Sequence, residues 1–386
     1  MLALSGQPGL LAQLPRPVPR TRLSVANEPG NDLGEKLRSC IRRLVPDGGT
    51  CDALSLSGRQ IIGSDPFVQN VGPLRVLLGN VTVEIAEAWS LPGDIELAGK
   101  GGGTVLRLAG GVNGDFIRNA GGAQGNRGIF IHDLTLDSSA AAQGGLGSTI
   151  HLVNVSGFTI QRVTVLNSMI HGIALDQGCT RGRLLDNRIE DVSRGSAIYA
   201  GSTSPSGQAS FLEIRGNKIG KVARANGIMV FGAAKGGHTH DVNIVENTLT
   251  GVKGIAIGVG DGAQKVTVAG NRIELKGAPG GSSGATGIAI RSSKDVHIVK
   301  NVVSGDMAEH DQMGMRAWSP VGDRGGPLVD VTISENDVSD IAGYGILVDS
   351  GSGVHLVKNK VRNTAKDSIR IDPKATGVTQ EGNNLP

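Results

Sequence analysis

The chain has 386 residues, of which 60 are glycine and only 3% are aromatic, and its 38 basic and 35 acidic side chains leave a formal net charge of +3. A single compact core stops growing near roughly 250 to 300 residues, whereas the core of a solenoid lengthens with every added turn. The small net charge argues against a nucleic-acid-binding protein, and no apolar run approaches the roughly 20 residues that cross a bilayer.

Residues 1–30 are predicted to be a disordered, proline-rich leader, followed by a single domain over residues 31–386. Residues 1–15 lack both the basic start and the continuous apolar stretch of a secretion signal, so a disordered segment is preferred over the remnant of such a signal. The proline-rich stretch that follows is typical of a stiff, solvated tether.

The domain is predicted to begin with a short amphipathic helix. Leu33, Leu37, Ile41 and Leu44 recur with helical spacing after an Asn/Asp cap, and Pro46 follows them. We expect this helix to cover the N-terminal end of a solenoid core, because such cores need a capped end.

Three cysteines, Cys40, Cys51 and Cys179, have no CxxC spacing and therefore no zinc signature. Cys40 lies on the predicted helix and Cys51 on the strand after it, so a disulfide between them is one interpretation for an exported protein. Two buried free thiols are the alternative.

One pattern recurs seven times: a strand of form apolar-x-apolar, two polar or small residues, an asparagine, any residue and an aliphatic residue. Its asparagines are Asn187, Asn217, Asn247, Asn271, Asn301, Asn336 and Asn359. A second element, Gly or Ser followed by apolar-x-apolar, lies between successive asparagines, so each period holds three short strands. The sequence therefore predicts an all-β fold, a parallel β-helix solenoid of about eleven coils.

Alternation within each strand predicts which side chains face the core. Ile228 and Val230 are expected to pack inside, while Met229 and Phe231 face out.

The matched asparagines have a structural interpretation. Asparagine tolerates the left-handed conformation that a sharp turn demands, and its amide can hydrogen-bond to the equivalent residue of the next coil. Upstream coils are expected to continue with Leu134 and Val163 at the same turn.

The helix, the turn "PDGGTCDA", the segment "LPGDIELAGKGGGTVLRL" and the "N-x-I … GI-x-I" coils resemble the pectate-lyase and polygalacturonase superfamily of right-handed parallel β-helix proteins. The resemblance extends from about Asn31 to the C-terminus and implies a right-handed coil. It also implies a secreted or cell-surface protein that binds a polysaccharide in a groove over one sheet. The catalytic motifs of polygalacturonases and the calcium-binding acidic cluster of pectate lyases are not found, so no catalytic residue is carried over.

If the "GI-x-I" strands form that sheet, their outward residues align in two columns. The first column is His151, Ala174, Ala197, Met229, Ala256, Ala289, Arg316, Leu347 and Arg370. The second column is Val153, Asp176, Tyr199, Phe231, Gly258, Arg291, Trp318, Asp349 and Asp372. Exposed aromatic rings beside arginine and aspartate are typical of a sugar-binding cleft.

Two clusters on these columns are candidate sites. The first combines the side chains of His151, His171, Asp176 and Tyr199, from three consecutive coils. The second, which the sequence favours, combines Arg291, Arg316, Trp318, Tyr344 and Asp349 with the loop residues Asp306, Glu309, His310 and Asp311. The residues expected to contact substrate are Trp318, Phe231, His151, His171 and Met229; those expected to act in catalysis are Arg316, Arg291, Tyr344, His310, Asp349, Tyr199 and Asp176.

These residue types fit two reactions. In β-elimination on a uronate chain, an arginine neutralises the carboxylate while a tyrosine, histidine or arginine removes the neighbouring proton. Hydrolysis needs two carboxylates, for which Asp349 and Asp372 are candidates. The arginines favour a polysaccharide lyase; a glycoside hydrolase, or a non-catalytic glycan-binding or surface scaffold protein, is the alternative.

No cofactor is expected. A calcium ion held by Asp306, Glu309 and Asp311 is the alternative to a solvated acidic loop, and His238 and His240 are interpreted as surface residues.

Overall fold

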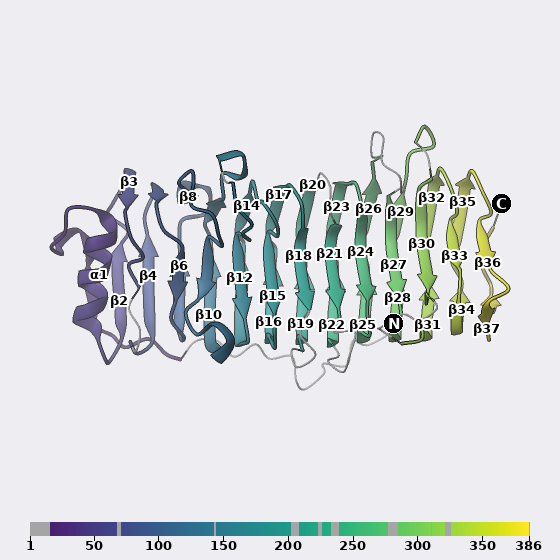
Figure 1. Cartoon of the computed structure of the whole chain (residues 1–386), viewed down its shortest axis with the longest axis horizontal. Coiled ribbons are helices and arrows are strands. Elements are labelled where there is room, and N and C mark those ends of the chain that lie inside the picture. The colour runs from purple at the N-terminus through teal and green to yellow at the C-terminus, as the bar shows by residue number, and fades with distance from the viewer. Residues whose placement is uncertain are drawn as a thin grey trace.

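The computed structural model describes residues 16–67, 71–142, 144–201, 208–222, 226–232, 239–276, 285–309, 311–320 and 326–385. In this part of the chain, the strands form three parallel sheets of 15, 12 and 11 strands. The chain visits the sheets in turn, and the coils stack into one elongated body (Figure 1). The predicted all-β parallel β-helix solenoid is confirmed.

Each sheet is a ladder of strands from successive coils. Sheet A contains β1 (Arg22–Ser24), β2 (Gly49–Ala53), β4 (Leu74–Leu78), β7 (Ile95–Ala98), β10 (Asn126–His132), β13 (Val155–Gln161), β16 (Thr180–Leu185), β19 (Ser210–Arg215), β22 (His240–Val245), β25 (Gln264–Ala269), β28 (Lys294–Val299), β31 (Val329–Ser334), β34 (Gly351–Val357), β37 (Ala375–Thr376) and β38 (Thr379–Glu381). Sheet B contains β3 (Gly58–Ile62), β5 (Val81–Ile85), β8 (Val105–Leu108), β11 (Thr135–Asp137), β14 (Thr164–Leu166), β17 (Arg188–Val192), β20 (Lys218–Val222), β23 (Thr248–Val252), β26 (Arg272–Leu275), β29 (Val302–Ser304), β32 (Asp337–Ile341) and β35 (Lys360–Thr364). Sheet C contains β6 (Trp89–Leu91), β9 (Ile117–Asn119), β12 (Ile150–Val153), β15 (Ile173–Asp176), β18 (Ser196–Gly201), β21 (Asn226–Phe231), β24 (Ile255–Gly260), β27 (Thr286–Arg291), β30 (Met313–Trp318), β33 (Ile346–Val348) and β36 (Ile369–Ile371).

The helix α1 (Leu33–Leu44) lies beside β2 at the N-terminal end of the stack (Figure 1). The Asp32 side chain accepts a hydrogen bond from the Glu35 amide at 2.8 Å, which satisfies one of the unpaired donors of the first turn. The apolar face of α1 is buried, and a disulfide joins Cys40 on the helix to Cys51 on β2. Among the described residues, no helix is long and apolar enough to span a membrane.

The ordered fold includes part of the segment predicted to be a leader. Strand β1 pairs in parallel with β2, a 3₁₀ turn follows at Val25–Asn27, and Val25 is fully buried. The prediction of a disordered leader is therefore wrong for residues 22–27. The alternation of polar and apolar residues extends only over residues 22–25 and directly follows a proline-rich stretch, so it is too short to distinguish a strand from a tether.

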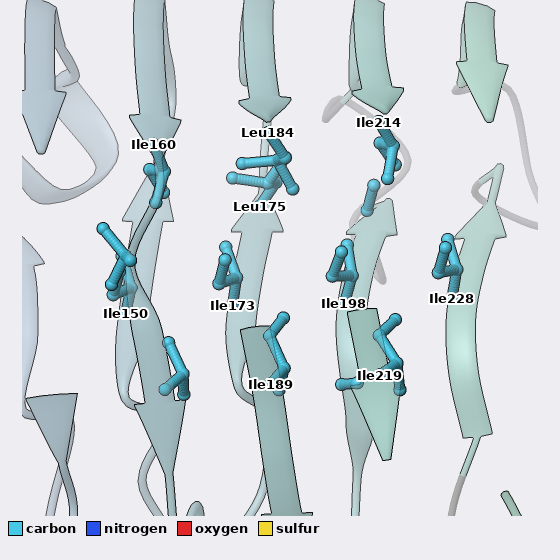
Figure 2. Close-up of a cluster of buried hydrophobic side chains, with 14 of the residues drawn as sticks. Ile150, Ile160, Ile173, Leu175, Leu184, Ile189, Ile198, Ile214, Ile219 and Ile228 are labelled. Carbon is cyan, nitrogen blue, oxygen red and sulfur yellow. The ribbon is translucent and has the colours of Figure 1, made fainter. Parts of the chain in front are cut away.

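The core runs along the axis of the stack. Ile150, Ile173, Ile198 and Ile228 occupy the same position on successive strands of sheet C, and Figure 2 shows them in line within one apolar cluster. Inward residues of sheets A and B complete each layer (Figure 2). Each coil thus adds its own layer of core, which explains how one domain exceeds the usual size of a compact one.

The asparagine ladder is present and has eight rungs, because Asn383 joins the seven predicted positions. Within the ladder, the side-chain amide of Asn271 donates to the Ile244 carbonyl and to Asn301 Oδ1, both at 2.9 Å. Its own Oδ1 accepts from the backbone and side chain of Asn247. The amide groups of buried rungs are therefore paired between coils.

The predicted conformation of these asparagines is wrong. The left-handed residue at each turn is the one before the asparagine: Asp186, Gly216, Glu246, Gly270, Lys300, Glu335, Lys358 and Gly382 have positive φ, while the ladder asparagines do not. The asparagine is thus required for its hydrogen bonds rather than for its tolerance of a strained backbone.

Candidate functional site

The outward residues of sheet C form columns, as predicted, but in a different register. The structure aligns Ser90, Arg118, His151, Ala174, Tyr199, Met229, Gly258, Ala289, Arg316, Leu347 and Arg370. Tyr199 therefore belongs to the column of His151, two positions away from its expected place beside Phe231. A shift of two residues keeps every side chain on its predicted face.

The shift arises because alanine replaces glycine at the start of two strands. A Cβ on Gly172 would lie 2.6 Å from the Ala197 carbonyl oxygen, and one on Gly227 would lie 2.4 Å from that of Ala256. Ala197 and Ala256 therefore occupy the glycine position of the repeat. The sequence-based alignment placed them two positions too far along the strand, level with Ala174 and Met229 instead of Gly172 and Gly227.

A cavity of about 360 Å³, here called the site pocket, opens over Ala174. His151 precedes Ala174 in the column and Tyr199 follows it, so the small alanine forms a floor between two larger side chains. His171, which lies just before β15, and Asp176, the last residue of β15, also line the pocket. All four members of the first predicted cluster are thus brought together.

Asp115 also lines the site pocket, and sequence reasoning missed it. It precedes β9 in a coil without the asparagine motif, so no repeat position marked it. Asp115 Oδ2 lies 2.8 Å from His151 Nδ1, and the Ser148 amide donates to Asp115 Oδ1 at 2.9 Å. The hydrogen bond to Asp115, opposed by burial, raises the pKa of His151 above its ordinary value.

The Asp115 carboxylate is held in its charged form. Burial acts to raise the pKa of Asp115, but the hydrogen bonds from His151 and the Ser148 amide outweigh it, so this pKa lies below its usual value. The charged carboxylate accepts a hydrogen bond from the Nδ1–H group of His151, which leaves Nε2 of the neutral ring as a proton acceptor.

His171 and Tyr199 form a stacked pair, with ring centroids 5.0 Å apart and planes inclined by 26°. The Ser196 amide donates to His171 Nδ1 at 2.9 Å, so in the neutral ring the proton is on Nε2. Burial lowers the pKa of His171. Burial, reinforced by the charge of Asp176, raises the pKa of Tyr199 to about 12, so its hydroxyl stays protonated near neutral pH.

Asp176 completes the pocket from the neighbouring column. Its Oδ1 accepts the Gln177 amide at 2.8 Å. Burial raises the pKa of Asp176, since the Gln177 amide and the charge of His151 compensate the loss of water only in part. This carboxyl therefore holds a proton to higher pH than an exposed aspartate.

The arginines of the second predicted cluster are already paired with carboxylates. Arg316 donates from Nε and Nη2 to Asp349 Oδ2, at 2.6 and 2.5 Å, and its guanidinium lies 4.6 Å from the centroid of the Trp318 ring. Arg291, which pairs with Trp318 across the sheet, is 3.6 Å from a carboxylate oxygen of Asp261.

Tyr344 has a different neighbour from the one predicted. It stands before β33, and the Lys366 ammonium lies 5.2 Å from the centroid of its ring. Lys366 is also 3.2 Å from Asp311. His310 lies outside the described residues. The second cluster thus divides into an arginine pair with Trp318 and a separate group around Lys366.

The two predicted contact residues on β21 differ in accessibility. Phe231 is half-buried, 6.3 Å from the Tyr199 ring, and a Cβ on Gly260 would lie 2.6 Å from its Cε1. Met229 faces outward but is only 2% exposed, because its thioether covers Gly258. Met229 is therefore covered in this structure, and its contact with substrate stays a prediction.

The part of the chain that the structure describes contains no group of three or more His, Cys, Asp or Glu residues able to hold a metal ion. Asp306 accepts the Ala308 amide, and Asp311 pairs with Lys366. His240 lies on β22 with Nδ1 2.6 Å from Asp241, while His238 is outside the described residues.

Comparison with known proteins agrees with this architecture. A family model described as "Right handed beta helix region" matches residues 204–385. The chain has the fold of a right-handed parallel β-helix protein. The coils before residue 204 continue the same three sheets, so the fold of this β-helix protein extends beyond the matched segment. No curated protein matches its sequence.

Several solved structures share the fold of this β-helix protein. The mannuronan C-5 epimerase AlgE4 A-module of Azotobacter vinelandii is 15% identical, with a TM-score of 0.56 over 93% of this chain and 100% of the other. A hyperthermoactive exopolygalacturonase from Thermotoga maritima is 10% identical, with a TM-score of 0.58 over 94% of both chains. The Streptococcus pneumoniae surface protein and adhesin PfbA is 12% identical, with a TM-score of 0.59 over 94% of this chain and 100% of the other. At such identities the likeness shows the fold alone, and it confirms the right-handed parallel β-helix that the resemblance implied.

Proposed function

We propose that this protein is a polysaccharide lyase that binds a uronate-containing chain over sheet C and cleaves it in the site pocket by β-elimination. The observation that carries the proposal is the hydrogen bond between Asp115 and His151, in a pocket that also contains Tyr199. A base oriented by a carboxylate, opposite a protonated acid, is the arrangement that proton abstraction with loss of a leaving group requires.

His151 is the general base of the proposed reaction. Asp115 orients its ring and stabilises the positive charge that the ring acquires, as a carboxylate does for histidine in other acid–base sites. The unprotonated Nε2 of His151 removes the proton from the sugar carbon next to the carboxylate of the substrate. The electron pair of that C–H bond forms the new C=C bond, and the bond to the glycosidic oxygen breaks.

Tyr199 is the general acid. Its raised pKa of about 12 keeps the hydroxyl protonated, so it can give its proton to the departing glycosidic oxygen. Tyr199 follows Ala174 while His151 precedes it, so two strand spacings, roughly 10 Å, separate their backbones. A sugar residue over Ala174 lies between them.

His171 binds the substrate carboxylate in this proposal. The Nε2–H of neutral His171 is a hydrogen-bond donor that points to the pocket it lines, and Asp176, whose pKa burial raises, lines the same pocket. Donors aimed at the carboxylate stabilise the negative charge that develops when the neighbouring proton leaves.

Two other reactions are weighed against elimination. Hydrolysis needs two available carboxylates, but Asp115 is bound to His151 and Asp349 to Arg316. Epimerisation is the second candidate, favoured by the likeness to a mannuronan C-5 epimerase. It shares the proton-abstraction step, after which the intermediate takes a proton on its opposite face and no bond to oxygen breaks.

A panel of acidic polysaccharides, including pectate, alginate and hyaluronan, tests the proposal. We expect an ultraviolet absorbance from unsaturated uronate products, abolished in His151→Ala and lowered at least about 100-fold in Tyr199→Phe. His297→Ala is the matched control, because His297 is an exposed histidine on sheet A that pairs only with Asp295 among the described residues. If the reaction is run in deuterated water, incorporation of deuterium into the polymer without the ultraviolet absorbance identifies an epimerase. New reducing ends without that absorbance identify a hydrolase.

Glycan binding without any of these products would instead indicate a non-catalytic role, as the likeness to a surface adhesin allows. The proposed location is outside the cytoplasm, at the cell surface or secreted. The disulfide between Cys40 and Cys51 supports it, because such bonds persist in oxidising compartments.

A further inference from the structure

Four arginines lie within the strands of sheet C, and one differs from the others. Three are within 3.6 Å of a carboxylate oxygen: Arg291 with Asp261, Arg316 with Asp349, and Arg370 with Asp367. Arg118, on β9, forms no ion pair with any described residue. Its positive charge is therefore the one among the four that no protein carboxylate in the described structure neutralises directly.

Arg118 stands next to His151 in the outward column and is exposed. Its Nε donates to Ser90 Oγ at 3.1 Å. Ser90 lies on the side of Arg118 away from the site pocket, and its hydrogen bond orients the guanidinium. This bond uses one of five N–H donors, so both terminal amino groups are available to a ligand. The column places Arg118 two strand spacings, roughly 10 Å, from Ala174 on the floor of the site pocket.

We propose that Arg118 binds the carboxylate of the sugar residue adjacent to the one in the site pocket, so that the substrate carries acidic residues at neighbouring positions. This inference rests on the proposed function, because it assumes a chain that lies along the column. One strand spacing is close to the length of one sugar residue in an extended chain. The neighbouring sugar then lies over His151, within reach of the Arg118 guanidinium, whose planar fork matches a carboxylate.

Selection for an acidic neighbour is expected on one side of the pocket only. On the opposite side the column continues with Tyr199, Met229, Gly258 and Ala289, all uncharged. A neutral sugar is therefore tolerated on the Tyr199 side, whereas on the Arg118 side it loses a charge-assisted hydrogen bond.

The test compares two substrates of equal length, a homopolymeric oligouronate and an oligosaccharide in which uronate alternates with a neutral sugar. Arg118→Ala is expected to raise the KM for the homopolymer by roughly 10- to 100-fold with kcat unchanged, and to leave the alternating substrate unaffected. Arg118→Lys should recover part of the loss. Arg370→Ala is the matched control, because it removes an exposed arginine from the far end of the same column.

Calorimetric binding of the same oligosaccharides separates this inference from the proposed reaction. A loss of affinity for the homopolymer alone in Arg118→Ala supports the role of Arg118, whether or not any substrate is turned over. Equal losses for both substrates, no loss for either, or no binding of the homopolymer by the unaltered protein would overturn it. Absence of turnover with binding retained counts against the lyase and leaves the Arg118 contact standing.

Discussion

Replacing one rung of the asparagine ladder separates its hydrogen-bonding role from a conformational one. Asn271 is 1% exposed, and its side chain takes part in two bonds with Asn247, one with Ile244, one with Asn301 and a longer one, 3.3 Å, with the Ala269 carbonyl. In Asn271→Ala all five are lost, and the backbone N–H of Asn247 is left buried without its acceptor. At about 0.5 to 1.5 kcal/mol for each bond, and more for the orphaned donor, we expect the free energy of unfolding to fall by roughly 3 to 6 kcal/mol.

The comparison with glycine makes this prediction decisive. Because Asn271 does not have a positive φ, Asn271→Gly should destabilise the protein at least as much as Asn271→Ala. Gly270 does have one, at +64°, so Gly270→Ala should cost roughly 1 to 2 kcal/mol. Denaturant unfolding followed by circular dichroism measures all three variants. A nearly neutral Asn271→Gly would refute the hydrogen-bonding account and restore the conformational one.

Three further predictions concern the site, the disulfide and the free thiol. The value of kcat/KM should rise as pH increases through the raised pKa of His151, because the base must be neutral to accept a proton. In Asp115→Asn this rise should occur at lower pH, because the charged hydrogen-bond partner that raises the pKa of His151 is lost. Reduction of the bond between Cys40 and Cys51, which are 11 residues apart, should destabilise the fold by roughly 2 to 3 kcal/mol, measured as a lower Tm. Cys179, buried with its pKa raised to about 12, should resist alkylation until the protein unfolds.

The fold was predictable from the sequence because each coil repeats the same physical requirement. An inward residue must be apolar in every coil, so positions such as Ile198 and Ile228 recur with a visible period. The same alternation correctly predicted which face Tyr199 and Arg316 occupy. Successive side chains of a strand point to opposite faces of the sheet, so an alignment error of two positions leaves each side chain on its predicted face.

The register within sheet C was less accessible, because it depends on backbone contacts rather than on hydrophobicity. Ala197 and Ala256 fill the position that Gly172, Gly227, Gly287, Gly314 and Gly345 occupy in other coils, and both neighbours of each alanine are also small or apolar. Only the close approach of Gly172 to the Ala197 carbonyl shows which residues are equivalent. Without it, Tyr199 could not be aligned with His151.

The composition of the site depends on what each charged side chain contacts, and the sequence does not contain that information. Arginines on an outer face suggest an anion-binding stripe, yet Arg291 and Arg316 bind carboxylates of the protein itself. Arg118 pairs with no carboxylate among the described residues and donates only its Nε–H, to Ser90, and it stands in a coil that lacks the asparagine motif. Asp115 precedes the same strand, so both residues that extend the site beyond the predicted cluster come from β9 and its approach. In a solenoid, the inward positions are constrained in every coil to maintain the core, whereas an outward position or a turn can change in one coil alone. Irregular coils are therefore where residues specific to function are expected, and where a method that searches for the repeat has the least to detect.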